Sequence, residues 1–322
     1  MHRIRAYRSG SAVLVTALLA VCLGLSACGG GGGGGAQASA QGSADAGTTS
    51  GPAYHEPASV ETASFSESAA VAGGGAYIDT STAAQGYVGA SATNQSRLKF
   101  QVTKGDMSYN YDLPSDGTPI ICPINMGDGS YAFRVMQNTS GSNYVEVLAT
   151  TANVVLESQF APFLHPNLFC DFTASSPSVA KARELAAGAQ NQGDVVRAVY
   201  EWVVGTIRYD KAKASQLANS TGYVPSPDDT LASSTGICFD YASLAAAMFR
   251  SLGIPCQIIT GYVEPGDIYH AWNMIYIDGS WVSVQLTVDP NTWTRMDLTF
   301  AASDGGTDTV GDGTSYTDRY VY

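Results

Sequence analysis

The 322-residue chain has 28 acidic and 16 basic residues, which gives a formal net charge of −12 at pH 7. This acidity argues against nucleic acid as a partner, because binding to phosphates requires an excess of lysine and arginine. The six cysteines include no Cys-x-x-Cys pair, so the spacing of zinc knuckles is absent, and no metal or other cofactor is predicted.

The first 28 residues have the composition of an export signal. Three arginines precede an apolar stretch at 12–24, which is too short and wrongly flanked for an ordinary membrane-spanning helix. The following Leu-Ser-Ala-Cys at 25–28 resembles a bacterial lipobox, with a plain secretory signal as the alternative. The resemblance implies cleavage before Cys28, a lipid on the Cys28 sulfur, and attachment to the extracytoplasmic face of the cell membrane.

Residues 29–75 are predicted to form a flexible tether. The segment opens with seven consecutive glycines and continues with alanine, serine, glycine and threonine. Such a composition cannot bury a core, so the tether would hold the folded part of the protein away from the membrane. The remaining length is sufficient for two domains, which we place at 76–172 and 173–322.

The first of these domains is predicted to be small and β-rich. Apolar and polar residues alternate at 97–102 and 109–113, and Asp-Gly pairs mark turns, which together indicate an antiparallel sheet or sandwich. No group of residues with an evident chemical role stands out there. In an exported chain, Cys122 and Cys170 could pair as a disulfide.

The second domain begins with helices and ends with strands. Helical spacing at 179–187 and 194–207 is followed by a third helix, which starts at Cys238 and ends at Gly253. Three strands follow, and Asp278-Gly279 predicts a hairpin between the last two. The predicted strands cover 257–263, 271–277 and 281–287. This order of elements predicts an α+β domain with an antiparallel sheet.

Cys238 and His270 are the candidate catalytic pair. A thiol in the first turn of a helix lies at the positive end of the helix dipole, which favours the thiolate. A nucleophilic cysteine with a histidine delivered by a later strand is an arrangement for acyl transfer. Asp240 is interpreted as an acid that complements the helix dipole, and Cys256 as a small buried residue.

Several short motifs resemble the transglutaminase-like superfamily, a papain-related cysteine fold found in animal transglutaminases and many bacterial proteins. Each motif is weak alone, but the set occurs in the family's order between about 180 and 295. The motifs are Gly-x-Cys-x-Asp-Tyr-Ala at 236–242, Leu-Gly-Ile-Pro at 252–255, His-Ala-Trp-Asn at 270–273 and Asp-Gly-x-Trp at 278–281. The resemblance implies a Cys–His–Asp triad with Cys238 as the nucleophile and His270 as the base.

The third member of that triad departs from the family pattern. The family's aspartate follows the tryptophan by four residues, and Gln285 occupies this position after Trp281. A glutamine oxygen can accept an imidazole N–H and orient the ring, although it cannot stabilise an imidazolium by charge. Asp289 is the alternative, but four residues of strand span about 13 Å, so it could serve only through a bulge or register shift. The predicted site is therefore Cys238, His270 and Gln285.

These features predict a membrane-anchored, extracellular thiol acyl-transfer enzyme. It would act on peptide or glutamine carboxamide bonds through a thioacyl intermediate, either as a peptidase or amidase or as a cross-linking enzyme. Its expected partners are an extracellular protein or a cell-wall peptide as substrate, and the membrane through the lipid anchor. The alternative is a catalytically weakened or inactive surface module for binding or structure, which Gln285 favours. A transporter's substrate-binding lipoprotein fits less well, because two α/β lobes are not evident.

Overall fold

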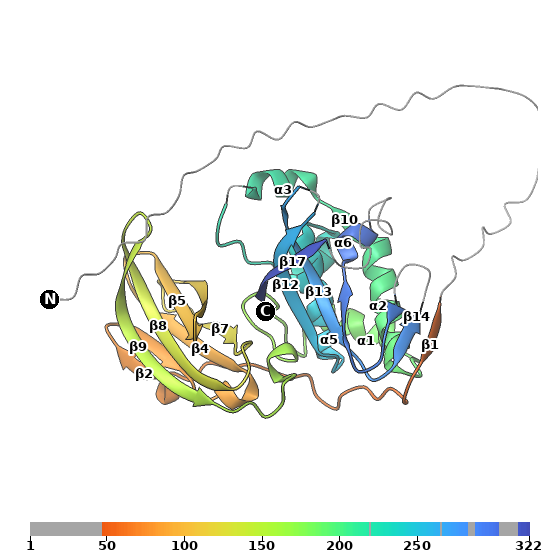
Figure 1. Ribbon diagram of the computed structural model, residues 1–322, viewed down its shortest axis with the longest axis horizontal. Coiled ribbons are helices and arrows are strands. Elements are labelled where there is room, and N and C mark those ends of the chain that lie inside the picture. Colours follow the sequence, from red (N-terminus) through yellow and green to blue (C-terminus); the bar gives the residue numbers. More distant parts are fainter. Residues whose placement is uncertain (1–46, 219, 265, 283–286, 303–314) are drawn as a thin grey trace, which may run out of the picture. The chain divides into compact units, whose positions relative to one another are not determined.

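The computed structural model describes residues 47–218, 220–264, 266–282, 287–302 and 315–322 (Figure 1). The predicted signal, the lipobox with Cys28 and the first part of the predicted tether lie outside these residues, as does Gln285. Within the described ranges, no helix combines the length and the apolar character needed to cross a membrane.

Two four-stranded antiparallel sheets form the part of the fold between residues 71 and 154. The first sheet has the order β2 (Val71–Gly73), β3 (Ala76–Asp79), β4 (Tyr87–Ala92) and β7 (Ile120–Pro123). The second has the order β6 (Met107–Leu113), β5 (Leu98–Lys104), β8 (Gly129–Ser140) and β9 (Asn143–Val154). Apolar residues of both sheets, among them Phe100 and Phe133, form one buried core. The strands predicted at 97–102 and 109–113 are confirmed as β5 and β6.

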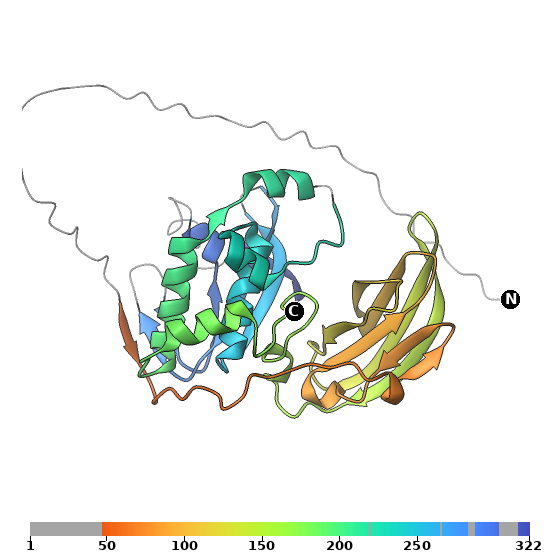
Figure 2. The ribbon, with the colours of Figure 1, turned by 180° about the vertical axis from the view of Figure 1, so that it is seen from behind.

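The C-terminal part combines helices with a four-stranded antiparallel sheet, so the predicted α+β class is confirmed. In order across the sheet, the strands are β16 (Trp293–Met296), β13 (Ile268–Tyr276), β12 (Cys256–Val263) and β17 (Tyr316–Val321). The helices are α1 (Pro177–Ala186), α2 (Gln192–Thr206), α3 (Lys211–Leu217), α4 (Pro227–Ser233), α5 (Cys238–Ser251) and α6 (Leu298–Ala301). α5 packs against β12 and β13 and is covered by α1, α2 and α4 (Figures 1 and 2).

The hairpin predicted at Asp278-Gly279 is wrong. β14 (Ser280–Val282) pairs with β1 (Thr48–Ser50) and β15 (Thr287–Val288), whereas the edge of β13 is paired with β16. The partner strand β1 lies more than two hundred residues earlier in the chain, so local sequence patterns do not reveal this pairing. Consequently, the strand that carries Trp281 is not the sheet neighbour of the strand that carries His270.

Residues 47–75 fall within the predicted tether, yet they pack on the folded part. Val60 is only 7% exposed and belongs to the C-terminal core, while Glu56 forms an ion pair with Arg183 at 2.8 Å. The Tyr54 hydroxyl donates to the carbonyl oxygen of Leu252 at the end of α5. A few anchoring side chains among many small polar ones hold this segment, which overall composition does not indicate.

The end of α5 is tied to three other segments by one buried arginine. Arg250 is 1% exposed, and its guanidinium donates to the carbonyl oxygens of Cys256, His165 and Tyr322, each at 2.9 Å. These three hydrogen bonds join the helix to the start of β12, to the loop before α1 and to the C-terminal residue. The guanidinium group is planar and carries several N–H donors in fixed directions, so one arginine can bind several carbonyl oxygens at once.

The four described cysteines are all free thiols. Cys122 and Cys170 are both buried, and the disulfide considered from the sequence is not formed. Cys256 is fully buried, as predicted.

Candidate active site

Cys238 is the first residue of α5, so the prediction that it lies in the first turn of a helix is confirmed. The chain reaches this helix through β11 (Thr235–Gly236), which pairs in parallel with β10 (Arg208–Tyr209). The carboxylate of Asp240 accepts the backbone N–H of Ile237 at 2.8 Å and thereby caps the helix start. The thiol remains half-buried at the positive end of the helix dipole.

Asp240 has a structural role beside Cys238. It is fully buried and accepts hydrogen bonds from Lys213 Nζ at 2.7 Å and from the Tyr223 hydroxyl at 2.5 Å. Burial would lower the pKa of Lys213, but its hydrogen bonds and the charge of Asp240 outweigh burial and raise it. Lys213 therefore compensates the buried carboxylate. The three side chains fix α3 and the loop after it against the start of α5.

His270 lies on β13, opposite Gly261 of β12. Its ring is 5% exposed and stacks on Phe300 with a centroid distance of 4.5 Å and an interplanar angle of 15°. A β-carbon at position 261 would lie 2.1 Å from the backbone oxygen of Thr317 on the paired strand β17, so glycine is needed at this close approach. The stacking on Phe300 holds the plane of the imidazole.

The acid that contacts His270 is Asp297. Its Oδ2 lies 2.8 Å from His270 Nε2 and also accepts the Tyr316 hydroxyl at 2.9 Å. Its Oδ1 accepts the backbone N–H of Phe300 at 3.0 Å, because Asp297 is the N-cap of α6. Asp297 is only 2% exposed, and its carboxylate contacts three donors: the His270 ring, the Tyr316 hydroxyl and the Phe300 backbone N–H. It is placed here because β16, which it directly follows, pairs with β13.

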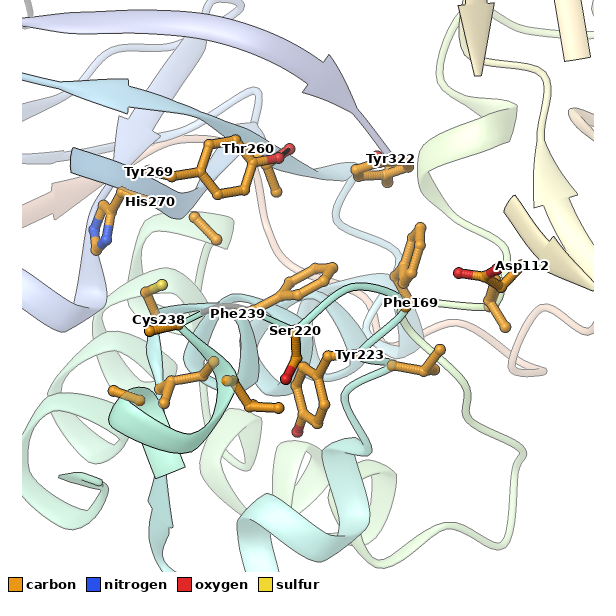
Figure 3. A pocket seen from close by; sticks show the side chains of 18 of the residues that line it. Asp112, Phe169, Ser220, Tyr223, Cys238, Phe239, Thr260, Tyr269, His270 and Tyr322 are labelled. Atoms are coloured by element: carbon orange, nitrogen blue, oxygen red, sulfur yellow. Dashed lines mark hydrogen bonds between the residues drawn. The ribbon is translucent and has the colours of Figure 1, made fainter. Parts of the chain in front are cut away.

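This environment favours the imidazolium form of His270. Burial lowers the pKa of His270, but hydrogen bonds and charges from Asp297 and Cys238 outweigh burial and raise it from 6.5 to about 10. Since Nε2 meets Asp297, the other ring nitrogen is left for the hydrogen bond with Cys238, and Figure 3 shows the two side chains next to each other at one end of the cavity. Burial and the charge of Asp297 also raise the pKa of Tyr316, so its hydroxyl remains a donor.

Cys238 and His270 open into a cavity of about 440 Å³. Aromatic rings line its middle, and the labelled side chains in Figure 3 lead from His270 and Cys238 past these rings to Asp112. The rings belong to Phe169, Tyr223, Phe239, Tyr269 and Tyr322. Among the described residues there is no group of three or more side chains arranged to hold a metal ion.

A family model described as the transglutaminase-like superfamily matches residues 179–286, about a third of the chain. This segment is a transglutaminase-like superfamily domain.

Curated relatives match only part of the chain. Human kyphoscoliosis peptidase is 30% identical over 125 residues, which are 36% of this chain and 18% of that protein. An uncharacterized protein of Mycobacterium leprae is 32% identical over 89 residues, which are 24% of this chain and 32% of that protein. The chain therefore spans about a third or less of the length of these relatives.

Two solved structures resemble the chain at low identity. A Cytophaga hutchinsonii protein provisionally assigned to the cysteine proteases is 18% identical with a TM-score of 0.37, covering 72% of this chain and 73% of that one. Red sea bream transglutaminase is 13% identical with a TM-score of 0.26, covering 72% of this chain and 49% of that one.

Within the transglutaminase-like domain, the structure brings two of the three predicted site residues together. Cys238 and His270 meet in the cavity, while Gln285 lies outside the described residues. Asp289, the alternative acid, is exposed, and its carbonyl oxygen accepts the Thr292 hydroxyl.

Sequence reasoning missed Asp297. The one local signal is an aspartate directly before a short apolar helical segment, which is typical of an N-cap. That signal predicts a helix start and carries no information about His270. Only the pairing of β16 with β13 turns this cap into a partner of the imidazole.

Proposed function

We propose that the protein is a membrane-anchored thiol acyl-transfer enzyme of the extracytoplasmic face, acting on peptide or glutamine carboxamide bonds. The observation that carries the proposal is the contact series Cys238–His270–Asp297 at the end of an open cavity. A buried carboxylate behind the imidazole stabilises its charged form, which in turn favours a thiolate on the neighbouring cysteine.

The chemistry follows from the position of each group. The Cys238 thiolate attacks the carbonyl carbon, and the leaving amine or ammonia takes a proton from His270 as the carbon–nitrogen bond breaks. The resulting thioester is then attacked by water, which gives a carboxylic acid, or by a lysine amine, which gives an isopeptide bond. His270 accepts the proton of this second nucleophile, and Cys238 is released as the thiolate. The side chains named here suffice for both routes.

The site of action is proposed from the N-terminal sequence. A lipid on Cys28 would hold the protein on the membrane, and the glycine-rich segment would let the folded part reach an extracellular protein or a cell-wall peptide.

Alkylation of the full chain with iodoacetamide near neutral pH tests the proposal. Burial raises the pKa of Cys170 to about 11 and also raises the pKa values of Cys122 and Cys256, so these three thiols should react slowly. We expect mass spectrometry to find Cys238 labelled first among the four. Equal labelling of Cys256, or a Cys238 that resists alkylation in the folded protein, would favour the alternative of an inactive surface module.

The two reaction outcomes can be separated in one incubation. A glutamine-containing peptide is mixed with the protein and a primary alkylamine, and the products are analysed by mass spectrometry. Hydrolysis yields the deamidated or cleaved peptide, and transfer yields the amine adduct. A Cys238→Ala variant serves as the control and should give none of these products.

A further inference from the structure

The cavity that contains Cys238 and His270 is built by both parts of the fold. Besides residues of the transglutaminase-like domain, it is lined by Lys99 of β5 and by Asn110 and Asp112 of β6. In Figure 3, Asp112 lies at the opposite end of the row of labelled side chains from His270. A substrate that fills the cavity from the thiol outward would therefore reach the β-rich part.

The middle of the cavity is apolar. The ring of Phe169 contacts Phe239, the neighbour of the nucleophile, at 5.3 Å, and it meets Tyr322 edge to face at 4.6 Å. All three rings line the cavity and are only partly buried. Partly exposed aromatic rings that are fixed by one another form a surface for a large apolar side chain.

The far end of the cavity holds a cluster of three charged side chains, of which Lys99 and Asp112 line the cavity. Asp112 Oδ1 is shared by two cations, Lys99 Nζ at 2.8 Å and Arg97 Nη2 at 3.0 Å. Burial raises the pKa of Asp112, but hydrogen bonds and charges from Lys99 and Arg97 outweigh it and lower the pKa, so the group is a carboxylate. Two cations and one anion give this cluster a net positive charge, although the chain as a whole carries −12.

Lys99 is placed to receive a further acidic group. Its side chain is 20% exposed and lines the cavity, whereas Arg97 is 51% exposed and stands outside the lining. An ammonium group has three N–H donors, and the contact with Asp112 uses one of them. A carboxylate from a ligand could thus bind Lys99 without displacing Asp112.

Resting on the proposed function, we infer that the acyl donor is an extended acidic peptide bound across both parts of the fold. Its large apolar side chain lies on the rings of Phe169, Phe239 and Tyr322, and its carboxylate lies on Lys99. The carboxylate belongs either to an Asp or Glu side chain or to the peptide's C-terminus. The β-rich part thereby acts as the specificity-determining half of the site.

Peptide binding to the full chain carrying Cys238→Ala tests this inference, because that variant binds without turnover. Fluorescently labelled peptides share a glutamine and a phenylalanine and differ in the acid: one series carries Glu at successive positions, a second carries a free C-terminus, and a third carries only carboxamides. We expect the best acidic peptide to bind about tenfold more tightly than its carboxamide counterpart, as for a hydrogen bond to a charged group. The two acidic series distinguish the two sources of the carboxylate.

Substitutions of Lys99 then test whether this side chain causes the preference for acidic peptides. Lys99→Met should reduce the acid preference to less than twofold, and Lys99→Arg should keep most of it. Lys181→Met removes a partly buried cation of α1 that pairs with Glu184 outside the cavity, and it should leave the preference unchanged. Equal binding of acidic and carboxamide peptides, or a preference that survives Lys99→Met, would overturn the inference.

The reactivity of Cys238 separates this result from the proposed function. With Cys238 present, Lys99→Met should be alkylated by iodoacetamide within about twofold of the parent rate, because Lys99 and the thiol line opposite ends of the cavity. If Cys238 is alkylated fast but acidic peptides bind no more tightly than carboxamide peptides, the inferred acidic substrate is refuted and the proposed enzyme function stands. If Cys238 of the parent protein resists alkylation, the proposed enzyme function is refuted, whichever peptides the protein binds.

Discussion

Replacing Asp297 with asparagine should uncouple the catalytic pair while leaving the fold in place. Asparagine has nearly the same size, and its carbonyl oxygen can still accept the Phe300 N–H that caps α6. Its amide nitrogen would then face His270 Nε2, where Asp297 Oδ2 now lies at 2.8 Å. A donor at this place favours the neutral imidazole with Nε2 unprotonated, which is the wrong form to pair with a thiolate.

The size of the effect follows from the hydrogen bond that is lost. A hydrogen bond to a charged group contributes about 1.5 to 3 kcal/mol, and a shift of one pKa unit corresponds to about 1.4 kcal/mol. The pKa of His270 should therefore fall from about 10 in the parent to about 8 to 9 in Asp297→Asn. The same free energy corresponds to a loss of about 10- to 100-fold in kcat/KM at neutral pH.

The ratio of alkylation rates with iodoacetate and with iodoacetamide reports this pKa. Iodoacetate, which is an anion, reacts faster relative to iodoacetamide while a positively charged imidazolium lies beside the thiolate. This relative rate falls as His270 deprotonates with rising pH. In the parent the advantage should persist to about pH 10, and in Asp297→Asn it should disappear one to two pH units lower. Asp289→Asn, at an exposed acid, is the matched control and should behave like the parent. An unchanged midpoint in Asp297→Asn, or an equal shift in Asp289→Asn, would refute the assignment of Asp297.

Three further changes extend the test. Gln285→Ala should slow alkylation of Cys238 less than twofold, because Asp297 already holds the imidazole; a loss as large as that in Asp297→Asn would instead support the orienting role predicted for Gln285. Cys28→Ala should release the protein from the membrane fraction or leave its signal uncleaved, and unchanged detergent-dependent association would rule out the lipid anchor. Arg250→Met should lower the free energy of unfolding by roughly 3 kcal/mol or more in urea titrations, because three carbonyl oxygens lose a buried donor. A change below about 1 kcal/mol there would mean that the carbonyl groups find other donors.

The helix position of Cys238 and the strand position of His270 could be predicted from the sequence because their signals are local. The helix that begins at Cys238 is marked by the capping acid at Asp240 and by the stop at Gly253, and His270 stands in a strand with a clear apolar run. These features are decided by residues within a few positions along the chain. The structure accordingly places the cysteine at the helix start and the histidine on β13.

The parts that escaped prediction depend on pairings between distant segments. β14 pairs with β1, which lies inside a stretch whose composition predicts a tether, and this pairing removes Trp281 from the neighbourhood of β13. The contribution of β5 and β6 to the cavity is also long-range, since Lys99 and Asp112 are more than a hundred residues from Cys238. Side-chain alternation predicted both strands but gave no indication of what their outer face would meet.

Sheet topology, rather than motif spacing, determines which acid serves His270. β16 pairs with β13 so that Met296 lies opposite Asn273, and the next residue, Asp297, leaves the strand within reach of the imidazole. The cap of α6 occupies one carboxylate oxygen, which leaves the other for His270 and for the Tyr316 hydroxyl on β17. The position that a family motif reserves for aspartate can therefore hold Gln285 without removing the negative charge from the site. The glutamine alone is then weak support for an inactive module, and the deciding measurement is the response of Cys238 to the loss of Asp297.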